Sequence, residues 1–229
     1  MAQQYGPKII TDGLVLSLDA ADKNSYPGSG TTWSDLSGNG INGTLTAASI
    51  GTDVPGSMDF NGSSEYVNLN EAGTPGASNG SVCAWIKLSG EANNHASIFC
   101  NQTGPAWANM RLDLNIKTPN QPYFHLADGV SHTGYGIIAS ALNYSQWYYV
   151  VGTYDGTYGK IYVDGVQNGS YSTSITPGTY TTSFCAIGYM NYSDRYFPGN
   201  IDIVQWYDKT LSTKEISQNF NAQRSRFGV

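Results

Sequence analysis

The segment WYYVVGTYDGTYGKIYVDGV (residues 147–166) decides the fold class of this 229-residue chain. It holds two runs rich in Tyr and Val, within the predicted strands Gln146–Tyr154 and Lys160–Val163, and an Asp-Gly pair follows each run. Asp-Gly is a strong hairpin signal, because a type I′ turn needs a positive φ at both of its central residues. We therefore predict an antiparallel meander with a tight turn at Asp164-Gly165.

Short apolar or alternating runs of the same kind recur along the chain, separated by Gly, Pro, Asn and Asp. No helical pattern lies between them, which favours an all-β sandwich or barrel over a βαβ fold. No internal repeat or long linker interrupts the series, so we expect one domain over residues 1–229, with residues 1–11 as an extended arm and residues 223–229 as a tail. The other predicted strands are Leu14–Asp19, Ser57–Phe60, Tyr66–Leu69, Ser81–Leu88, Ser97–Asn101, Met110–Ile116, Tyr123–Ala127, Gly136–Ala139, Phe184–Tyr189 and Asn200–Tyr207.

One helix is predicted near the C-terminus. Ser212 and Glu215 form the S-x-x-E pattern of a capping box, in which each side chain accepts a hydrogen bond from an N–H group at the helix start. Ile216 and Phe220 lie one turn apart on the same face. We therefore expect a short helix over Thr213–Ala222, packed against the sandwich by this face.

Composition limits the classes of partner. Hydrophobic residues make up 40 % of the chain and include 5 Trp and 17 Tyr, enough for a sizeable core, while only 12 % of residues are charged and the net charge is −6. Nucleic-acid affinity rests on clustered Lys and Arg, so we expect no nucleic-acid partner. No apolar run approaches the roughly 18 residues of a membrane span, and the N-terminus lacks the apolar core of a signal peptide. We therefore expect neither a membrane partner nor an export signal.

The three cysteines, Cys83, Cys100 and Cys185, show no CxxC spacing. Because their number is odd and free Cys is usually buried, we expect buried thiols rather than a disulfide framework or a zinc site. A single Cys83–Cys100 or Cys83–Cys185 bridge is the alternative.

Four blocks in register carry a resemblance to a known family: residues 12–45 (DGLVLSLDAADKNSYPGSGTTWSDLSGNGINGTL), 58–69 (MDFNGSSEYVNL) with 81–88 (SVCAWIKL), 147–166, and 197–222 (FPGNIDIVQWYDKTLSTKEISQNFNA). Together they resemble the concanavalin A-like (laminin G-like) domains common in bacteriophage structural proteins and bacterial surface proteins. The resemblance implies a two-sheet antiparallel jelly-roll sandwich with one C-terminal helix. This fold hosts lectins, glycoside hydrolases and inert spacers, so the function must be argued from residues.

Catalysis is not expected. Retaining glycosidases on this sandwich need two neighbouring carboxylates, as an E-x-D-x-x-E strand provides. The corresponding segment here is Asn200-Ile201-Asp202-Ile203-Val204-Gln205, with amides at both outer positions. The three histidines match no zinc motif. The sequence therefore predicts a protein that is not an enzyme.

The resemblance also implies a calcium ion on the rim loops. Calcium takes six to eight oxygen ligands, and Asp35, Asn39, Asn42 and Asp202 are the candidates. The alternative is that these residues are turn formers whose side chains bond to nearby backbone.

Exposed aromatic residues are the candidates for ligand contact, because sugar-binding modules combine ring platforms with polar side chains. Each could instead serve a protein interface, where Tyr is enriched, or simply lie on the surface. The candidates in loop-like contexts are Trp107, Tyr135, Tyr158, Tyr192, Arg195 and Tyr196. The tryptophans expected in core packing are Trp33, Trp85, Trp147 and Trp206.

These features suggest two functions. A polar, Tyr-rich surface without an export signal fits a bacteriophage virion surface protein, assembled in the host cytoplasm as a capsid decoration, fibre or tail-associated module. Its partners would be other virion proteins, copies of itself and host glycans. The alternative is a calcium-dependent carbohydrate-binding module of a bacterial surface or secreted protein, located extracellularly.

Overall fold

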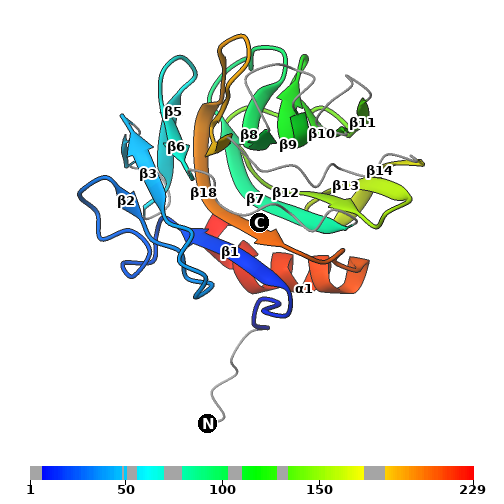
Figure 1. Cartoon of the computed structure of the whole chain (residues 1–229), viewed down its shortest axis with the longest axis horizontal. Helices are drawn as coiled ribbons and strands as arrows, with labels where there is room; N and C mark the ends of the chain where they lie inside the picture. Colours follow the sequence, from blue (N-terminus) through cyan, green and yellow to red (C-terminus); the bar gives the residue numbers. More distant parts are fainter. Residues whose placement is uncertain are drawn as a thin grey trace.

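The computed structural model describes residues 7–47, 49–50, 56–69, 79–102, 110–127, 134–172 and 184–229. They form two large antiparallel sheets stacked face to face, with a C-terminal helix on the outside of one of them (Figure 1). The predicted fold class, a two-sheet jelly-roll sandwich with one short helix, is confirmed.

Sheet A has the strand order β14-β13-β12-β7-β18-β5-β4, and β1 also pairs with β18. Its strands are β1 (Leu14–Asp19), β4 (Ser49–Ile50), β5 (Met58–Asn61), β7 (Gly80–Leu88), β12 (Trp147–Tyr154), β13 (Tyr158–Val163), β14 (Val166–Ser172) and β18 (Pro198–Tyr207).

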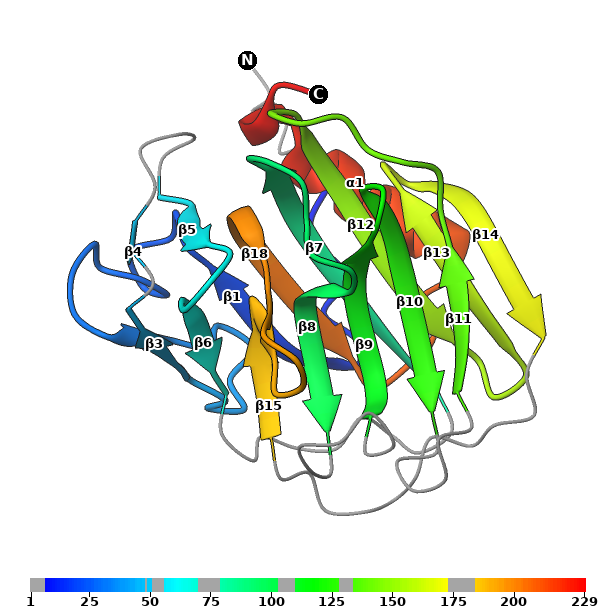
Figure 2. The same cartoon turned by 90° about the horizontal axis from the view of Figure 1, so that it is seen from above.

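Sheet B has the order β11-β10-β9-β8-β15-β6-β3-β2, and Figure 2 looks onto β8, β9, β10 and β11 side by side. A separate small hairpin pairs β16 (Tyr189–Met190) with β17 (Arg195–Tyr196). The strands of sheet B are β2 (Thr32–Trp33), β3 (Gly43–Thr46), β6 (Tyr66–Asn68), β8 (Ala96–Gln102), β9 (Met110–Lys117), β10 (Gln121–Ala127), β11 (Gly134–Ile138) and β15 (Phe184–Ile187).

The predicted meander is β12-β13-β14. At its second turn Asp164 has φ 51° and Gly165 has φ 80°, the pair of positive values that a type I′ turn requires. The Asp164 carboxylate also accepts a hydrogen bond of 2.9 Å from the Tyr149 backbone N–H, which ties the turn to β12. This prediction is confirmed.

The main core lies between the sheets. Trp33 and Trp206 are fully buried there, and the Trp206 ring lies 5.7 Å from that of Phe99 on the opposite sheet. Trp85 and Trp147 are also buried, but they belong to a second apolar cluster on the outer face of sheet A. All four tryptophans are therefore packed, as predicted.

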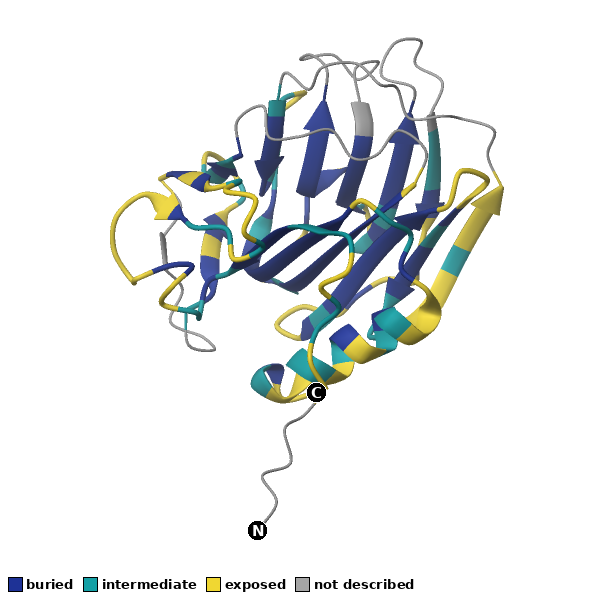
Figure 3. Cartoon of the chain, turned by 60° about the horizontal axis from the view of Figure 1, so that its bottom comes forward, coloured by how far each residue is buried: buried dark blue, intermediate teal, exposed yellow. Residues whose placement is uncertain are grey.

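Helix α1 (Thr213–Gln223) covers that outer face and continues into a 3₁₀ turn, Arg224–Phe227 (Figure 3). The Trp85 ring is stacked 5.7 Å from Phe220 and 4.0 Å from Phe227. The apolar face of the helix and the first residues after it thus seal the outside of sheet A.

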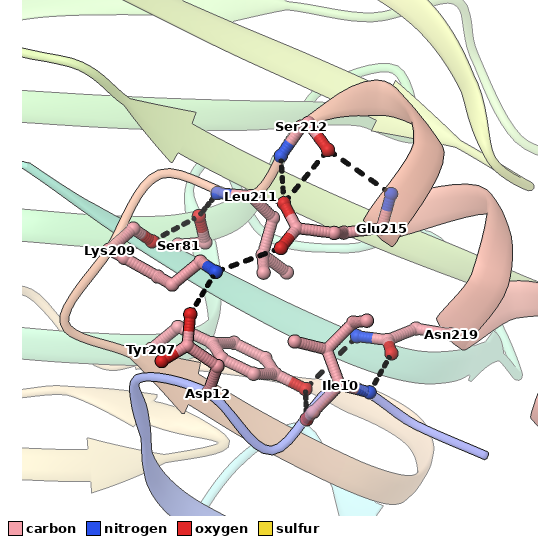
Figure 4. Close-up of polar contacts among 9 residues, drawn as sticks. All are labelled: Ile10, Asp12, Ser81, Tyr207, Lys209, Leu211, Ser212, Glu215 and Asn219. Atoms are coloured by element: carbon pink, nitrogen blue, oxygen red, sulfur yellow. Dashed lines mark hydrogen bonds and ion pairs between the residues drawn. The ribbon is translucent and has the colours of Figure 1, made fainter.

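The predicted capping box is present at the start of α1 (Figure 4). Ser212 Oγ accepts a hydrogen bond from the Glu215 N–H at 3.3 Å, and Glu215 Oε2 accepts one from the Ser212 N–H at 2.7 Å. Lys209 Nζ lies 2.8 Å from Glu215 and 2.6 Å from Asp12. Its ammonium group, together with Ser212, lowers the pKa of Glu215 to about 2.

A buried amide joins the helix to the N-terminal segment. Asn219 Oδ1 accepts a hydrogen bond of 2.7 Å from the Ile10 N–H, and its Nδ2 donates at 3.0 Å to the Tyr207 hydroxyl (Figure 4). The same hydroxyl donates to the Ile10 carbonyl at 3.0 Å. The described end of the predicted arm is therefore fixed against β18 and α1, whereas residues 1–6 lie outside the described part.

All three cysteines are buried and free, so the expectation of reduced thiols is confirmed. Within the described ranges, the structure contains no helix long and apolar enough to cross a membrane.

Candidate functional site on the outer face of sheet B

The outer face of sheet B carries polar side chains where the outer face of sheet A carries aromatic rings. On β9, Leu112 and Leu114 belong to the core, so the alternation of a strand turns Asp113 and Asn115 to the outside. Asp113 lies opposite His125 of β10 in the sheet register. We call the following residues the polar cluster: His95, Ser97, Asp113, Asn115, Tyr123 and His125.

Hydrogen bonds link the centre of the polar cluster. Ser97 Oγ donates to Asp113 Oδ1 at 2.6 Å, and Asn115 Nδ2 donates to Asp113 Oδ2. His95 Nδ1 lies 3.3 Å from Asn115 Oδ1. The side chains of Ser97, Asp113 and Asn115 are fully buried, so their positions are fixed within the protein.

Burial sets the protonation states of the cluster. It raises the pKa of Asp113 to about 7, against the opposing effect of the Ser97 and Asn115 hydrogen bonds and of the Arg195 charge. Burial likewise lowers the pKa of His95 and of His125 to about 4, so both rings are neutral at pH 7. A neutral imidazole carries one donor and one acceptor nitrogen, so the buried cluster contains both kinds of hydrogen-bonding group.

Tyr123 supplies a partly exposed ring beside these groups. Its ring lies edge-on to His95 at 5.0 Å and parallel to His125 at 6.0 Å. Lys117 places its ammonium group 5.3 Å from the same ring. A Cβ on Gly136 would lie 1.7 Å from the Tyr123 ring, so this position of β11 needs glycine for room.

The β16–β17 hairpin lies against the same face. The Tyr189 and Tyr196 rings stack at 4.3 Å, and the Arg195 guanidinium lies 5.2 Å from the Tyr192 ring. Cys100 Sγ, on β8, donates to the Tyr189 carbonyl at 3.1 Å. The charge of Arg195 also acts on the polar cluster, since it lowers the pKa of Asp113 and of both histidines.

The structure separates the six candidate contact residues. Tyr192, Arg195 and Tyr196 lie together beside the polar cluster, and Trp107 lies outside the described residues. Tyr135 instead stacks on Tyr171 at 5.1 Å, where β11 and β14 meet at the edge of the sandwich. Tyr158 is 47 % exposed and lies on β13 of sheet A, whereas the polar cluster lies on sheet B.

Three of the four calcium candidates, Asp35, Asn39 and Asn42, lie in one hydrogen-bonded loop, whereas the contacts of Asp202 are with other residues. The Asp35 carboxylate accepts hydrogen bonds from the backbone of Ser17 and Ser37, each at 2.9 Å. Asn42 Oδ1 accepts one from the Asp35 N–H at 2.9 Å, and Asn39 Nδ2 donates to the Val15 carbonyl at 3.0 Å. These are the contacts of turn formers. The calcium site stays a prediction.

The Asp202 carboxylate lies beside the guanidinium group of Arg226. Arg226 Nη2 lies 3.3 Å from Asp202 Oδ2, and Nη1 donates to both oxygens of Asp19 at 2.9 and 3.0 Å. Burial raises the pKa of Asp202 to about 7, while Arg226 opposes this shift. Arg226 and Asp19 line a pocket of about 410 Å³ between β1, β18 and the C-terminal segment. In the described part of the chain, no three His, Cys, Asp or Glu residues are arranged to hold a metal.

The polar cluster was not predicted from the sequence. The alternation in RLDLNIK (residues 111–117) does place Asp113 and Asn115 on one face, but a polar outer face is ordinary for an antiparallel sheet. What distinguishes the cluster is burial, which depends on other strands and on the hairpin.

The fold and the site together define a class of protein. It is a two-layer β-sandwich whose outer face carries pre-ordered polar and aromatic side chains. The chain belongs to the concanavalin A-like lectin/glucanases superfamily, whose laminin G-type family model matches residues 61–217. Among curated protein sequences, none matches this chain significantly.

Solved structures agree on the fold. Domain 4 of AbnA, an extracellular GH43 arabinanase from Geobacillus stearothermophilus, was solved in complex with arabinotriose; it is 18 % identical with a TM-score of 0.70, over 91 % of this chain and 98 % of that domain. The receptor-binding domain of a botulinum neurotoxin C/D mosaic serotype is 18 % identical with a TM-score of 0.71, over 93 % of this chain and 52 % of the other. Trypanosoma rangeli sialidase in complex with the inhibitor DANA is 17 % identical with a TM-score of 0.68, over 95 % and 34 %. At this identity the likeness shows the fold alone.

Proposed function

We propose that this protein is a non-catalytic glycan-recognition module that binds its ligand on the outer face of sheet B, at the polar cluster and the β16–β17 hairpin. The observation that carries the proposal is the hydrogen-bonded, buried network of Ser97, Asp113 and Asn115 beside the partly exposed Tyr123 ring. Sugars present hydroxyl groups that both donate and accept, next to apolar ring faces. Tyr123 supplies a partly exposed ring, and the buried, hydrogen-bonded groups beside it hold that face of the sheet in one arrangement.

Rigidity supports the proposal further. Ser97, Asp113 and Asn115 are fully buried and bonded to one another, which offsets the cost of burying polar groups and holds them in one arrangement. Pre-ordered side chains lose little freedom on binding, which favours affinity. The arabinotriose bound to domain 4 of AbnA gives a precedent for a sugar on this fold.

The absence of catalysis is part of the proposal. Glycosidases of the two main types act through a pair of carboxyl groups. Within the described polar cluster, Asp113 is the single carboxyl. Hydrolysis of any member of a polysaccharide panel by the purified protein would overturn this part.

We further propose that the module works on the surface of a bacteriophage virion. Its low charged fraction of 12 % supports this setting, as does the resemblance to phage structural domains. Mass spectrometry of purified virions is the test, and absence of the protein from them would contradict the proposal.

The binding test is a glycan array followed by isothermal titration with Tyr123→Ala. Removing the ring should weaken binding about two- to tenfold, because a stacked aromatic contact contributes roughly 0.5–1.5 kcal/mol. Tyr158→Ala is the matched control, an exposed tyrosine on sheet A, and should bind as the wild type does. An array with no binder, or equal affinities for wild type and Tyr123→Ala, would contradict the proposed site. Adding a chelator should leave glycan binding unchanged. Loss of binding in the presence of the chelator would favour the calcium-dependent alternative.

A further inference from the structure

Two cations converge on the proposed site from different elements. Arg195 comes from the first residue of β17, and Lys117 from the last residue of β9. Burial is the main cause that lowers the pKa of His95, and the charges of both Arg195 and Lys117 lower it further. Both cations therefore act on the same ring of the polar cluster. The local charge is opposite in sign to the net charge of −6.

Each cation lies beside an aromatic ring. Arg195 is 5.2 Å from the Tyr192 ring, and Lys117 is 5.3 Å from the Tyr123 ring. Neither cation is fully exposed. A partly desolvated cation is screened less than one in open solvent, so its attraction for an anion is stronger.

The nearby carboxyl of Asp113 does not cancel this charge below neutral pH. Its two oxygens accept hydrogen bonds from Ser97 and Asn115, and burial raises its pKa to about 7. The facing histidines, His95 and His125, have lowered pKa values of about 4 and are neutral over the same range. Asp194, in the β16–β17 hairpin, is exposed to solvent and therefore screened.

We infer that the ligand of this site is a carboxylate-bearing oligosaccharide, an inference that rests on the function proposed above. The sugar carboxylate would lie between Arg195 and Lys117, with a sugar ring against Tyr123 or Tyr192 and hydroxyls toward the polar cluster. Guanidinium suits this role, because its planar donors match a carboxylate in a bidentate arrangement.

The test compares ligands that differ only in charge. Trigalacturonate is paired with its methyl ester, and 3′-sialyllactose with its methyl ester, so that uronate and sialate sources are distinguished. Titrations use the full chain at pH 6 in low salt. We expect the acidic member of at least one pair to bind at least about tenfold more tightly than its neutral partner, the effect of one charge-assisted hydrogen bond.

Variants assign the effect to the two cations. Arg195→Gln and Lys117→Gln should each remove most of the preference for the acidic ligand, whereas Arg195→Lys should keep part of it. Lys160→Gln is the control, since Lys160 lies on β13 of sheet A and pairs with Asp155 at 3.9 Å. Circular dichroism checks that Arg195→Gln is folded. If Arg195→Gln does not fold, a folded Arg195→Lys variant keeps the test valid.

The outcomes separate the two proposals. Equal affinity for acidic and neutral members, weakened by Tyr123→Ala but not by Arg195→Gln, would overturn the inference and leave the glycan site standing. No binding to any member of these pairs overturns the inference. If the wider array is also blank, the proposed function fails with it.

Discussion

The two sheets have the same architecture but opposite outer faces. Outside sheet A, Trp85 stacks with Phe220 and Phe227 under α1, and the side chains exclude water. Outside sheet B, Asp113 and His125 are buried just as deeply, yet they are polar. Burying rings stabilises a fold, whereas burying a carboxyl and two imidazoles costs stability. This difference indicates a structural role for the outer face of sheet A and supports the proposed binding role of the outer face of sheet B.

The largest expected effect on stability comes from the outer face of sheet A, which α1 covers. Trp85→Ala removes a fully buried indole from between β7, α1 and the C-terminal turn. We expect a loss of about 3–5 kcal/mol in the free energy of unfolding, the usual cost of such a truncation. Chemical denaturation measures it. Val166→Ala, at a side chain that is 66 % exposed, is the control and should change little; a loss below about 1 kcal/mol for Trp85→Ala would break the comparison.

The free energy of unfolding should depend on pH through the polar cluster on the outer face of sheet B. The folded-state pKa of Asp113, about 7, is above the ordinary aspartate value of 3.8. The folded state therefore binds the proton more tightly, and stability is lost as pH rises toward 7. Asp113→Asn removes this loss, so the variant should gain on the order of 2 kcal/mol relative to wild type between pH 5 and pH 8.

Thermal unfolding of both proteins at the two pH values measures this difference. Since His95 and His125 are present in both proteins, their own titration largely cancels in the comparison. A difference between variant and wild type that does not change with pH would show that the Asp113 carboxyl does not carry the effect.

A smaller effect should come from the start of the helix. Ser212→Ala removes the side chain that accepts the Glu215 N–H in the capping box. We expect about 1 kcal/mol of destabilisation and unchanged glycan affinity, because α1 lies on the opposite sheet. Weakened glycan binding in a folded Ser212→Ala would contradict the division of roles between the two faces.

Much of the fold could be predicted from local patterns. The Asp164-Gly165 turn needs only its own two residues, and the capping box of Ser212 and Glu215 spans a single helical turn. The predicted helix ends one residue short of the observed one. The strands β2 and β3 were missed, because the segment around Thr32–Thr46 is dense in Gly, Asn and Ser, which usually signal turns.

The site was only partly predictable. Tyr192, Arg195 and Tyr196 were candidates because they lie in a loop-like stretch of polar and aromatic residues, and the structure places them beside the polar cluster. Their role in ligand contact stays a prediction. The polar cluster was not predicted, since β8, β9 and β10 must come together before Asp113 is buried. Tyr135 lies apart from the polar cluster, because it stacks on Tyr171 of the other sheet, and its role as a contact residue stays a prediction.

The most direct test of the binding face is a titration of ¹⁵N-labelled protein followed by amide chemical shifts. The ligand is trigalacturonate or 3′-sialyllactose, whichever binds. We expect the shifted amides to map to β8, β9, β10 and the β16–β17 hairpin, with α1 and sheet A unaffected. Shifts centred on α1 or on the loop around Asp35, or no shifts with either ligand, would contradict the assignment of the outer face of sheet B as the site that recognises acidic glycans.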